Sequence, residues 1–169
     1  QRMLKEADDD RWTVADASDL YEVSRWGKGY FSIGPHGHVL VHPSKDPDHH
    51  IDLKDLIDQL QLRGLDLPIL LRFNGILQHR LEEIHAAFSS AIDEFEYTGK
   101  YHCVYPIKVN QQRQVVEEIV RHSHRLGFGL EAGSKPELLA LIALVENGTP
   151  IICNGSKDAQ FIEAAMLAQ

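Results

Sequence analysis

One lysine, Lys108, stands in an otherwise apolar stretch, residues 105–110 (YPIKVN). The apolar run 101–109 predicts a β-strand with Lys108 near its carboxyl end, on the same face as Val104 and Pro106. Enzymes with parallel sheets place their active sites at the carboxyl ends of the strands. An amine in a partly desolvated pocket has a lowered pKa and attacks carbonyl groups to form a Schiff base. The alternative is a lysine that extends from the strand end into water.

Repeating elements surround this lysine. Short apolar runs at residues 69–73, 101–109, 127–132 and 150–154 predict strands. Helical periods follow them at residues 76–95, 111–122, 135–146 and from 157 to the end. Four successive βα units predict a parallel sheet buried on both faces. Periodicity leaves open a doubly wound sheet or the first half of a (β/α)8 barrel, since a complete barrel takes about 250 residues.

The first 50 residues have a different pattern. Two apolar runs, 29–33 and 38–43, flank the turn sequence GPHG and predict a β-hairpin, with a loop at 43–50. An amphipathic helix is expected over 51–62, closed by Gly64. We therefore expect residues 1–50 to contribute a tail and a hairpin to a β-rich domain, and 51–169 to form the sheet of βα units. The acidic run 6–10 is expected to be a solvated tail.

Composition narrows the class of protein. Among 169 residues, 17 Lys and Arg oppose 25 Asp and Glu, a net charge of −8 with the basic residues scattered, which argues against nucleic acid as a partner. No apolar run approaches the roughly 20 residues that span a bilayer, so we expect no membrane span and a cytoplasmic location. Cys103 and Cys153 are expected to be reduced packing thiols. The start at Gln1 and the uncapped pattern before Gln169 indicate a piece of a longer polypeptide.

The ten histidines form several close pairs, at residues 36 and 38, 49 and 50, and 122 and 124. None has the spacing to acids or cysteines that is typical of a zinc site. We expect them to have surface or helix-capping roles, and the sequence identifies no metal ligands.

The residues around Lys108 resemble a known enzyme family. Residues 105–111 (YPIKVNQ) and 129–138 (GLEAGSKPEL) look like the biosynthetic arginine decarboxylases, of the alanine-racemase-like fold type of pyridoxal-phosphate enzymes. The resemblance extends to residues 12–41, 68–74 and 150–158 and so covers nearly the whole chain. Related ornithine and diaminopimelate decarboxylases typically have Ala at the position of Pro106 and Asp at that of Glu131. Those two departures favour the arginine enzymes.

The resemblance implies a barrel that binds pyridoxal 5'-phosphate as a Schiff base to Lys108, and a β-rich domain that includes the hairpin. It implies decarboxylation of L-arginine to agmatine and CO2, a step toward putrescine and spermidine, in a homo-oligomer associated with Mg2+. Glu131 would then lie beside the lysine and cofactor, where it pairs with the Lys108 ammonium or holds its geometry; otherwise it is an exposed acid. Pro106 would contact the cofactor by packing. Ser134 is a further cofactor-binding candidate whose simpler role is a helix N-cap, and the simpler role for Asn110 is likewise a cap on the next helix.

Two alternative functions remain open at this stage. One is decarboxylation of another amino acid, namely ornithine, lysine or diaminopimelate. The other is a catalytically inactive, decarboxylase-like protein that regulates partners. Residues 1–169 alone are expected to have no arginine decarboxylase activity, because half a barrel leaves open strand edges and lacks most of the site.

Overall fold

The computed structural model describes residues 11–169, which fall into two compact units that divide after Ile76. The acidic run 6–10 lies outside the described residues. None of the helices between residues 11 and 169 combines the length and apolar character needed to cross a bilayer. Each unit has its own three-stranded sheet.

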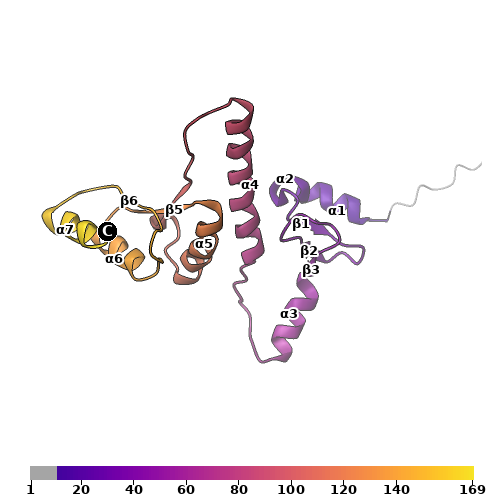
Figure 1. Ribbon diagram of the computed structural model, residues 1–169. Helices are drawn as coiled ribbons and strands as arrows, with labels where there is room; N and C mark the ends of the chain where they lie inside the picture. Colours follow the sequence, from indigo (N-terminus) through magenta and orange to yellow (C-terminus); the bar gives the residue numbers. More distant parts are fainter. Residues whose placement is uncertain (1–10) are drawn as a thin grey trace, which may run out of the picture. The chain divides into compact units, whose positions relative to one another are not determined.

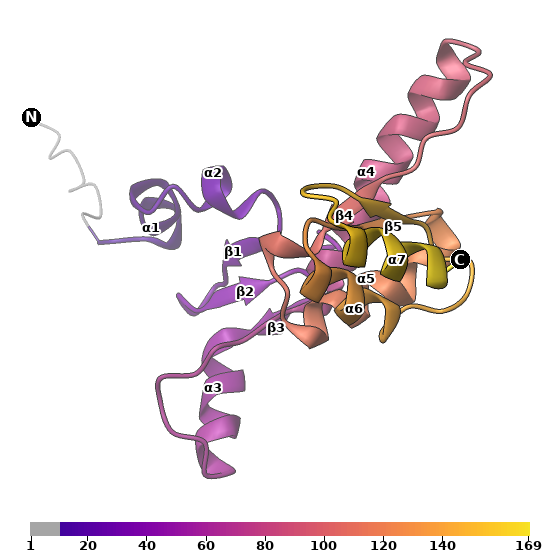
Figure 2. The same ribbon diagram turned by 90° about the vertical axis from the view of Figure 1, so that its left-hand side faces the viewer.

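The sheet of the first unit is antiparallel, in the order β1-β2-β3 (Figure 2). Strands β1 (Phe31–Ile33) and β2 (Val39–Val41) form the predicted hairpin. The expected helix over 51–62 begins later, because Ile51–Asp52 forms β3 on the other edge of β2. Asp52 then caps α3 (Leu53–Leu62), since its side chain accepts hydrogen bonds from the first backbone N–H groups of the helix. A polar N-cap in extended backbone explains why the helix begins after this strand.

Two short helices, α1 (Val14–Leu20) and α2 (Val23–Gly27), precede the hairpin and were not predicted. Thr13 and Asp16 form a capping box: the Thr13 hydroxyl accepts from the Asp16 N–H, and the Asp16 carboxylate accepts from the Thr13 N–H at 2.8 Å. This Thr-x-x-Asp pattern was the sequence signal for α1. The small core of the unit contains Val23, Tyr30 and Val41.

The prediction of a strand over residues 69–73 is wrong. In the described structure these residues form no strand, and they lead directly into α4 (Asn74–Glu94). A strand exists only where its backbone pairs with a neighbour, and an apolar run does not supply that partner. Three βα units are therefore observed where four were predicted.

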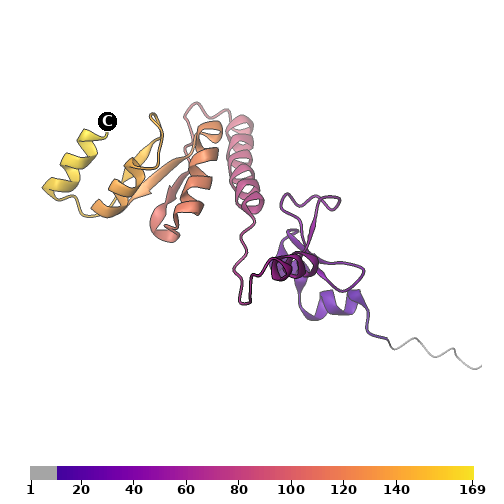
Figure 3. The same ribbon diagram turned by 90° about the horizontal axis from the view of Figure 1, so that it is seen from below.

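The second unit is built around the parallel sheet β4-β5-β6. Its elements after α4 are β4 (Val104–Pro106), α5 (Arg113–Leu126), β5 (Gly129–Ala132), α6 (Lys135–Ile142), β6 (Ile151–Cys153) and α7 (Ala159–Leu167) (Figure 1). The helices follow one another in chain order along the unit (Figure 3). Gly127, with φ of 66°, ends α5 in the left-handed conformation that a helix C-terminus favours.

All four helices contribute to one hydrophobic cluster on one face of this sheet. Leu130 and Ala132 of β5 are fully buried there. The helices add Leu81 from α4, Val116, Ile119 and Val120 from α5, Leu138 and Leu141 from α6, and Phe161 from α7. Alternation along the strands sends Glu131 and Ile152 to the other face, where Ile152 is 48% exposed. The prediction of a sheet buried on both faces therefore fails within the described residues.

The two cysteines are unpaired, as predicted. Cys103 and Cys153 are half-buried and pack against the same cluster. They act as small apolar side chains.

Candidate active site

Lys108 lies just beyond the strand in which it was predicted, in the turn that follows. Strand β4 ends at Pro106, and residues Ile107–Val109 form a 3-10 turn. The expectation that Lys108 shares a strand face with Val104 is therefore wrong. Ile107 is only 2% exposed and packs into the core. Because a 3-10 turn rotates successive side chains by about 120°, burial of Ile107 turns Lys108 outward, where its side chain is 60% exposed.

Glu131 is the nearest acid to this lysine in the described structure. It lies on β5, in register with Pro106 of β4, so neighbouring parallel strands bring together residues that are 23 apart in sequence. The Nζ atom of Lys108 is 3.4 Å from Oε1 of Glu131, and the carboxylate side chain is only 16% exposed. The fold thus pairs a reachable amine with a shielded acid at the carboxyl edge of the sheet.

Asn154 completes this group and was missed by the sequence analysis. It follows β6, and its Nδ2 donates to the same Oε1 of Glu131 at 3.4 Å. Glu131 on the central strand is therefore flanked by a donor from each side (Lys108 and Asn154). The signal was available, since a polar residue directly after a parallel strand falls at the same edge as Lys108.

Ser134 caps helix α6, as its simpler role required. Its hydroxyl accepts from the Glu137 N–H at 3.4 Å, and the Glu137 carboxylate accepts from the Gly133 N–H at 2.6 Å. The two contacts satisfy backbone donors at the start of the helix. Ser134 follows Glu131 by three residues, and Pro106 is the partner of Glu131 on the neighbouring strand β4; both side chains are half-buried. That either one contacts a cofactor remains a prediction.

Hydrogen bonds also secure the segment that follows the lysine. The Tyr105 hydroxyl donates to the carbonyl oxygen of Asn110 at 3.1 Å, which closes the chain around the 3-10 turn. Burial raises the pKa of Tyr105, so the phenol stays protonated as a donor. The Asn110 side chain accepts from the Gln112 N–H at 3.1 Å, immediately before α5. The expected capping role of Asn110 is not borne out: Gln112 is the N-cap of α5, without a side-chain cap hydrogen bond, and Asn110 instead holds the turn that precedes it.

An ion pair joins the starts of α6 and α7. Lys135 Nζ lies 2.9 Å from Oδ2 of Asp158, and Asp158 also caps α7 through the Phe161 N–H. The hydrogen bond from Lys135 and then that from Phe161 hold the pKa of Asp158 below its usual value. This pair ties the loops after β5 and β6 near the Lys108 group.

The histidines lie partly where they were expected. His38 Nδ1 is 2.8 Å from Oδ2 of Asp52, and Asp55 adds a second acid to this group. Since Asp52 also caps α3, its contacts join the hairpin to the helix. His42 departs from the expected surface role: it is 8% exposed, and its Nε2 lies 2.7 Å from the Ser32 hydroxyl.

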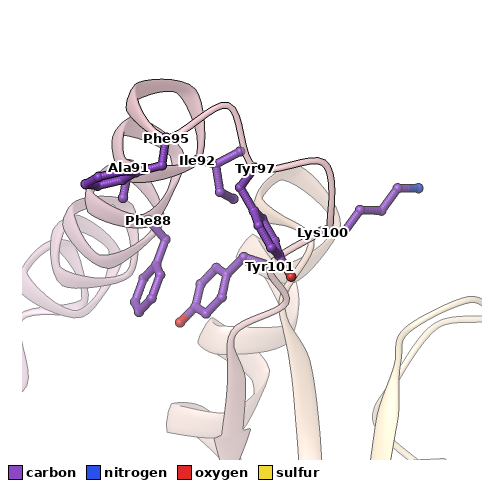
Figure 4. Close-up of a pocket in the computed structure, with 7 residues that line it drawn as sticks. All are labelled: Phe88, Ala91, Ile92, Phe95, Tyr97, Lys100 and Tyr101. Carbon is purple, nitrogen blue, oxygen red and sulfur yellow. The ribbon is translucent and has the colours of Figure 1, made fainter.

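An apolar pocket of about 400 Å3 lies at the opposite edge of the second sheet (Figure 4). Phe88 of α4 stacks on Tyr101, with ring centroids 3.8 Å apart. Tyr101 precedes β4, whereas Lys108 follows it, so the pocket and the lysine belong to opposite ends of the strand. The Lys100 side chain points away from the aromatic rings (Figure 4). The pocket lining is almost wholly apolar, whereas Lys108, Glu131 and Asn154 bring an amine, a carboxylate and an amide together, so this polar group is the candidate active site.

Comparisons with known proteins all find similarity to decarboxylases. The family profile described as "Pyridoxal-dependent decarboxylase, pyridoxal binding domain" matches residues 81–169. The biosynthetic arginine decarboxylase of Rhodopirellula baltica is 58% identical over 161 residues, 95% of this chain and 24% of that protein. The one from Gloeobacter violaceus is 50% identical over 159 residues, 94% of this chain and 25% of that protein. The chain thus spans about a quarter of the length of these relatives.

A solved structure gives the same result. The crystal structure of the biosynthetic arginine decarboxylase SpeA from Campylobacter jejuni matches with a TM-score of 0.79 and 37% identity. The match covers 88% of this chain and 24% of the other. The profile match includes Lys108, Glu131 and Asn154.

Proposed function

The chain belongs to the pyridoxal-dependent decarboxylases, and from that membership we propose that it is part of an enzyme that converts L-arginine to agmatine and CO2. The observation that carries the proposal is the 3.4 Å approach of Lys108 Nζ to Glu131 at the carboxyl edge of a parallel sheet, inside the matched segment. Arginine as the substrate is supported by relatives named as biosynthetic arginine decarboxylases.

The residues at this edge fit pyridoxal phosphate. The cofactor carries an aldehyde, and Lys108 offers a primary amine that is 60% exposed. We propose that Lys108 binds it covalently, and that Glu131, Pro106 and Ser134 line the place where it binds. When bound, the cofactor supplies an electron sink for the electron pair left by departing CO2.

The chain's own contribution is to orient groups and hold protons. Glu131 Oε1 accepts from Lys108 Nζ at 3.4 Å, which draws the amine toward the carboxyl edge of the sheet. If pyridoxal phosphate is bound, Lys108 would hold the cofactor through Nζ, and the same amine, beside the Glu131 carboxylate, would be placed to hold a proton and return it to the substrate. The 3-10 turn, closed by the hydrogen bond from Tyr105 to Asn110, keeps the lysine at the strand end.

We further propose that the second unit is part of a (β/α)8 barrel. Its strands lie in chain order, β4-β5-β6, and α4 to α7 share one cluster on one face. A doubly wound sheet instead places helices on both faces. The open face with Glu131 and Ile152 would then be the barrel interior. In this arrangement residues 1–50 belong to a β-rich domain through the β1-β2 hairpin. Of the expected barrel segment 51–169, residues 77–169 form the barrel part, because β3 (Ile51–Asp52) pairs with β2 and the two units divide after Ile76.

The remaining expectations come from the family resemblance and are proposals for the full-length protein. They are a role in making polyamines such as putrescine and spermidine, a cytoplasmic homo-oligomer and an association with Mg2+. The competing functions are decarboxylation of ornithine, lysine or diaminopimelate, and regulation of partners without catalysis.

The test uses the full-length protein with pyridoxal phosphate. Borohydride reduction followed by peptide mapping is expected to find the cofactor on Lys108, and CO2 release is expected with arginine in preference to the three other amino acids. An adduct on a different lysine would overturn the site assignment. Release of CO2 from ornithine, lysine or diaminopimelate in preference to arginine would change the substrate. An adduct on Lys108 without CO2 from any of the four would favour the regulatory alternative.

A further inference from the structure

We infer that Asn154 is a positioning residue that holds the Glu131 carboxylate against Lys108. The inference deepens the proposed function and rests on it for its catalytic meaning. The geometric basis is that one oxygen, Oε1 of Glu131, accepts from both Lys108 Nζ and Asn154 Nδ2, each at 3.4 Å. Both contacts are long, so neither alone fixes the carboxylate.

The two donors act from opposite sides of the central strand. Lys108 follows β4 and Asn154 follows β6, while Glu131 lies on β5 between them. The terminal torsion of a glutamate side chain is broad, so a carboxylate with one partner rotates easily. A second donor on the far side limits that rotation. Because the amide of Asn154 is neutral, it does so without changing the charge that Lys108 meets.

The backbone of Asn154 is itself well anchored. Its N–H donates to the Ala132 carbonyl oxygen at 2.9 Å, which continues the β5-β6 ladder by one residue. The next residue, Gly155, has φ of 115°, and a Cβ there would collide with the carbonyl oxygen of Gly133. The two strand-end loops therefore touch, and only glycine permits this approach. Asn154 is thus presented to Glu131 from a fixed base.

The experiment measures the reactivity of Lys108 in cofactor-free, full-length protein. Competitive acylation with acetic anhydride at one fixed pH, read by peptide mass spectrometry, reports how much of the amine is free of its partner. Asn154→Ala is expected to raise the acylation rate of Lys108 by about twofold to fivefold, because a loosely held Glu131 pairs less well with the ammonium. Asn154→Leu, which keeps a similar shape without the donor, is expected to do the same.

A double-variant cycle shows whether the effect passes through Glu131. In a Glu131→Gln background, Asn154→Ala is expected to change Lys108 acylation by less than about 1.5-fold, since the paired carboxylate is already gone. The Lys157 amine donates to the Gly155 carbonyl at 3.0 Å in the same loop and serves as an internal reference. Asn147→Ala, at an exposed asparagine outside the site, is the matched control.

The outcomes separate the two proposals. Unchanged or slower acylation of Lys108 in both Asn154 variants would overturn the inference, as would an effect that persists in the Glu131→Gln background. An equal rise at Lys157 would indicate a disrupted loop and also overturn it. If acylation behaves as expected but the wild-type protein forms no borohydride-stable adduct on Lys108, the positioning contact stands and the proposed function fails.

Discussion

Replacing Gly155 by alanine is expected to loosen the edge of the sheet that carries the candidate site. Two costs add. A residue with a side chain at φ of 115° is strained by about 1–3 kcal/mol. The new Cβ also meets the carbonyl oxygen of Gly133, so the strand-end loops must separate, with the loss of the Asn154-to-Ala132 hydrogen bond, about 0.5–1.5 kcal/mol. The sum is a local destabilisation of about 1.5–4.5 kcal/mol.

Native-state hydrogen exchange on the full-length protein measures this locally. The amide of Asn154 is expected to exchange faster in Gly155→Ala, by the factor that corresponds to the lost free energy of opening. The matched control is Gly148→Ala: Gly148 also has positive φ, 88°, but a Cβ there meets nothing within 4 Å. It therefore carries the strain without the collision. Equal effects of the two substitutions on peptide 150–158 would refute the argument from close approach.

Three further predictions follow from the same edge of the sheet. In the full-length enzyme, Lys108→Ala is expected to lower arginine decarboxylation at least about a hundredfold and to abolish the borohydride adduct, whereas Lys100→Ala retains both; a retained adduct in Lys108→Ala would contradict the assignment. Ser134→Ala is expected to destabilise the first turn of α6 by about 1 kcal/mol, seen as faster amide exchange there, and unaltered exchange would count against the cap. The pKa of Asp158 is below its ordinary value of 3.8, chiefly because of Lys135, so its contribution to stability is present above that value and lost as pH falls through the lowered folded pKa. An NMR titration of Asp158 is expected to move toward the ordinary value in Lys135→Met, and an unmoved titration would show that the ion pair does not form in solution.

Sequence patterns predicted the local elements well where each was decided by neighbours along the chain. The turn GPHG between two apolar runs predicted the β1-β2 hairpin, and the 3.6-residue periods predicted the helices α4 to α7 of the second unit to within a few residues. Helix α6 was predicted from Ser134 and the Pro and Glu that follow it, and the structure has this cap. Such signals are local because a cap or a turn involves residues only a few positions apart.

The errors occurred where pairing with a distant segment decided the outcome. Residues 69–73 are apolar enough for a strand, yet they have no pairing partner in the described structure. Ile51 begins a helical period, yet it pairs with Val41 as part of β3. Lys108 was placed on a strand that stops at Pro106, because burial of Ile107 begins a 3-10 turn. An apolar run does not say where its ladder of hydrogen bonds ends.

The sequence by itself determined the local chemistry: an amine at the end of an apolar run, an acid and an asparagine at the ends of two others, and the motifs that resemble the arginine decarboxylases. Only the tertiary structure decided that these groups meet. The register of β4, β5 and β6 brings Lys108 and Asn154 to the same carboxylate oxygen of Glu131, although the lysine and the asparagine are far apart along the chain. Register is set by the packing of a shared core on the opposite face, a property of the whole sheet that no single segment encodes.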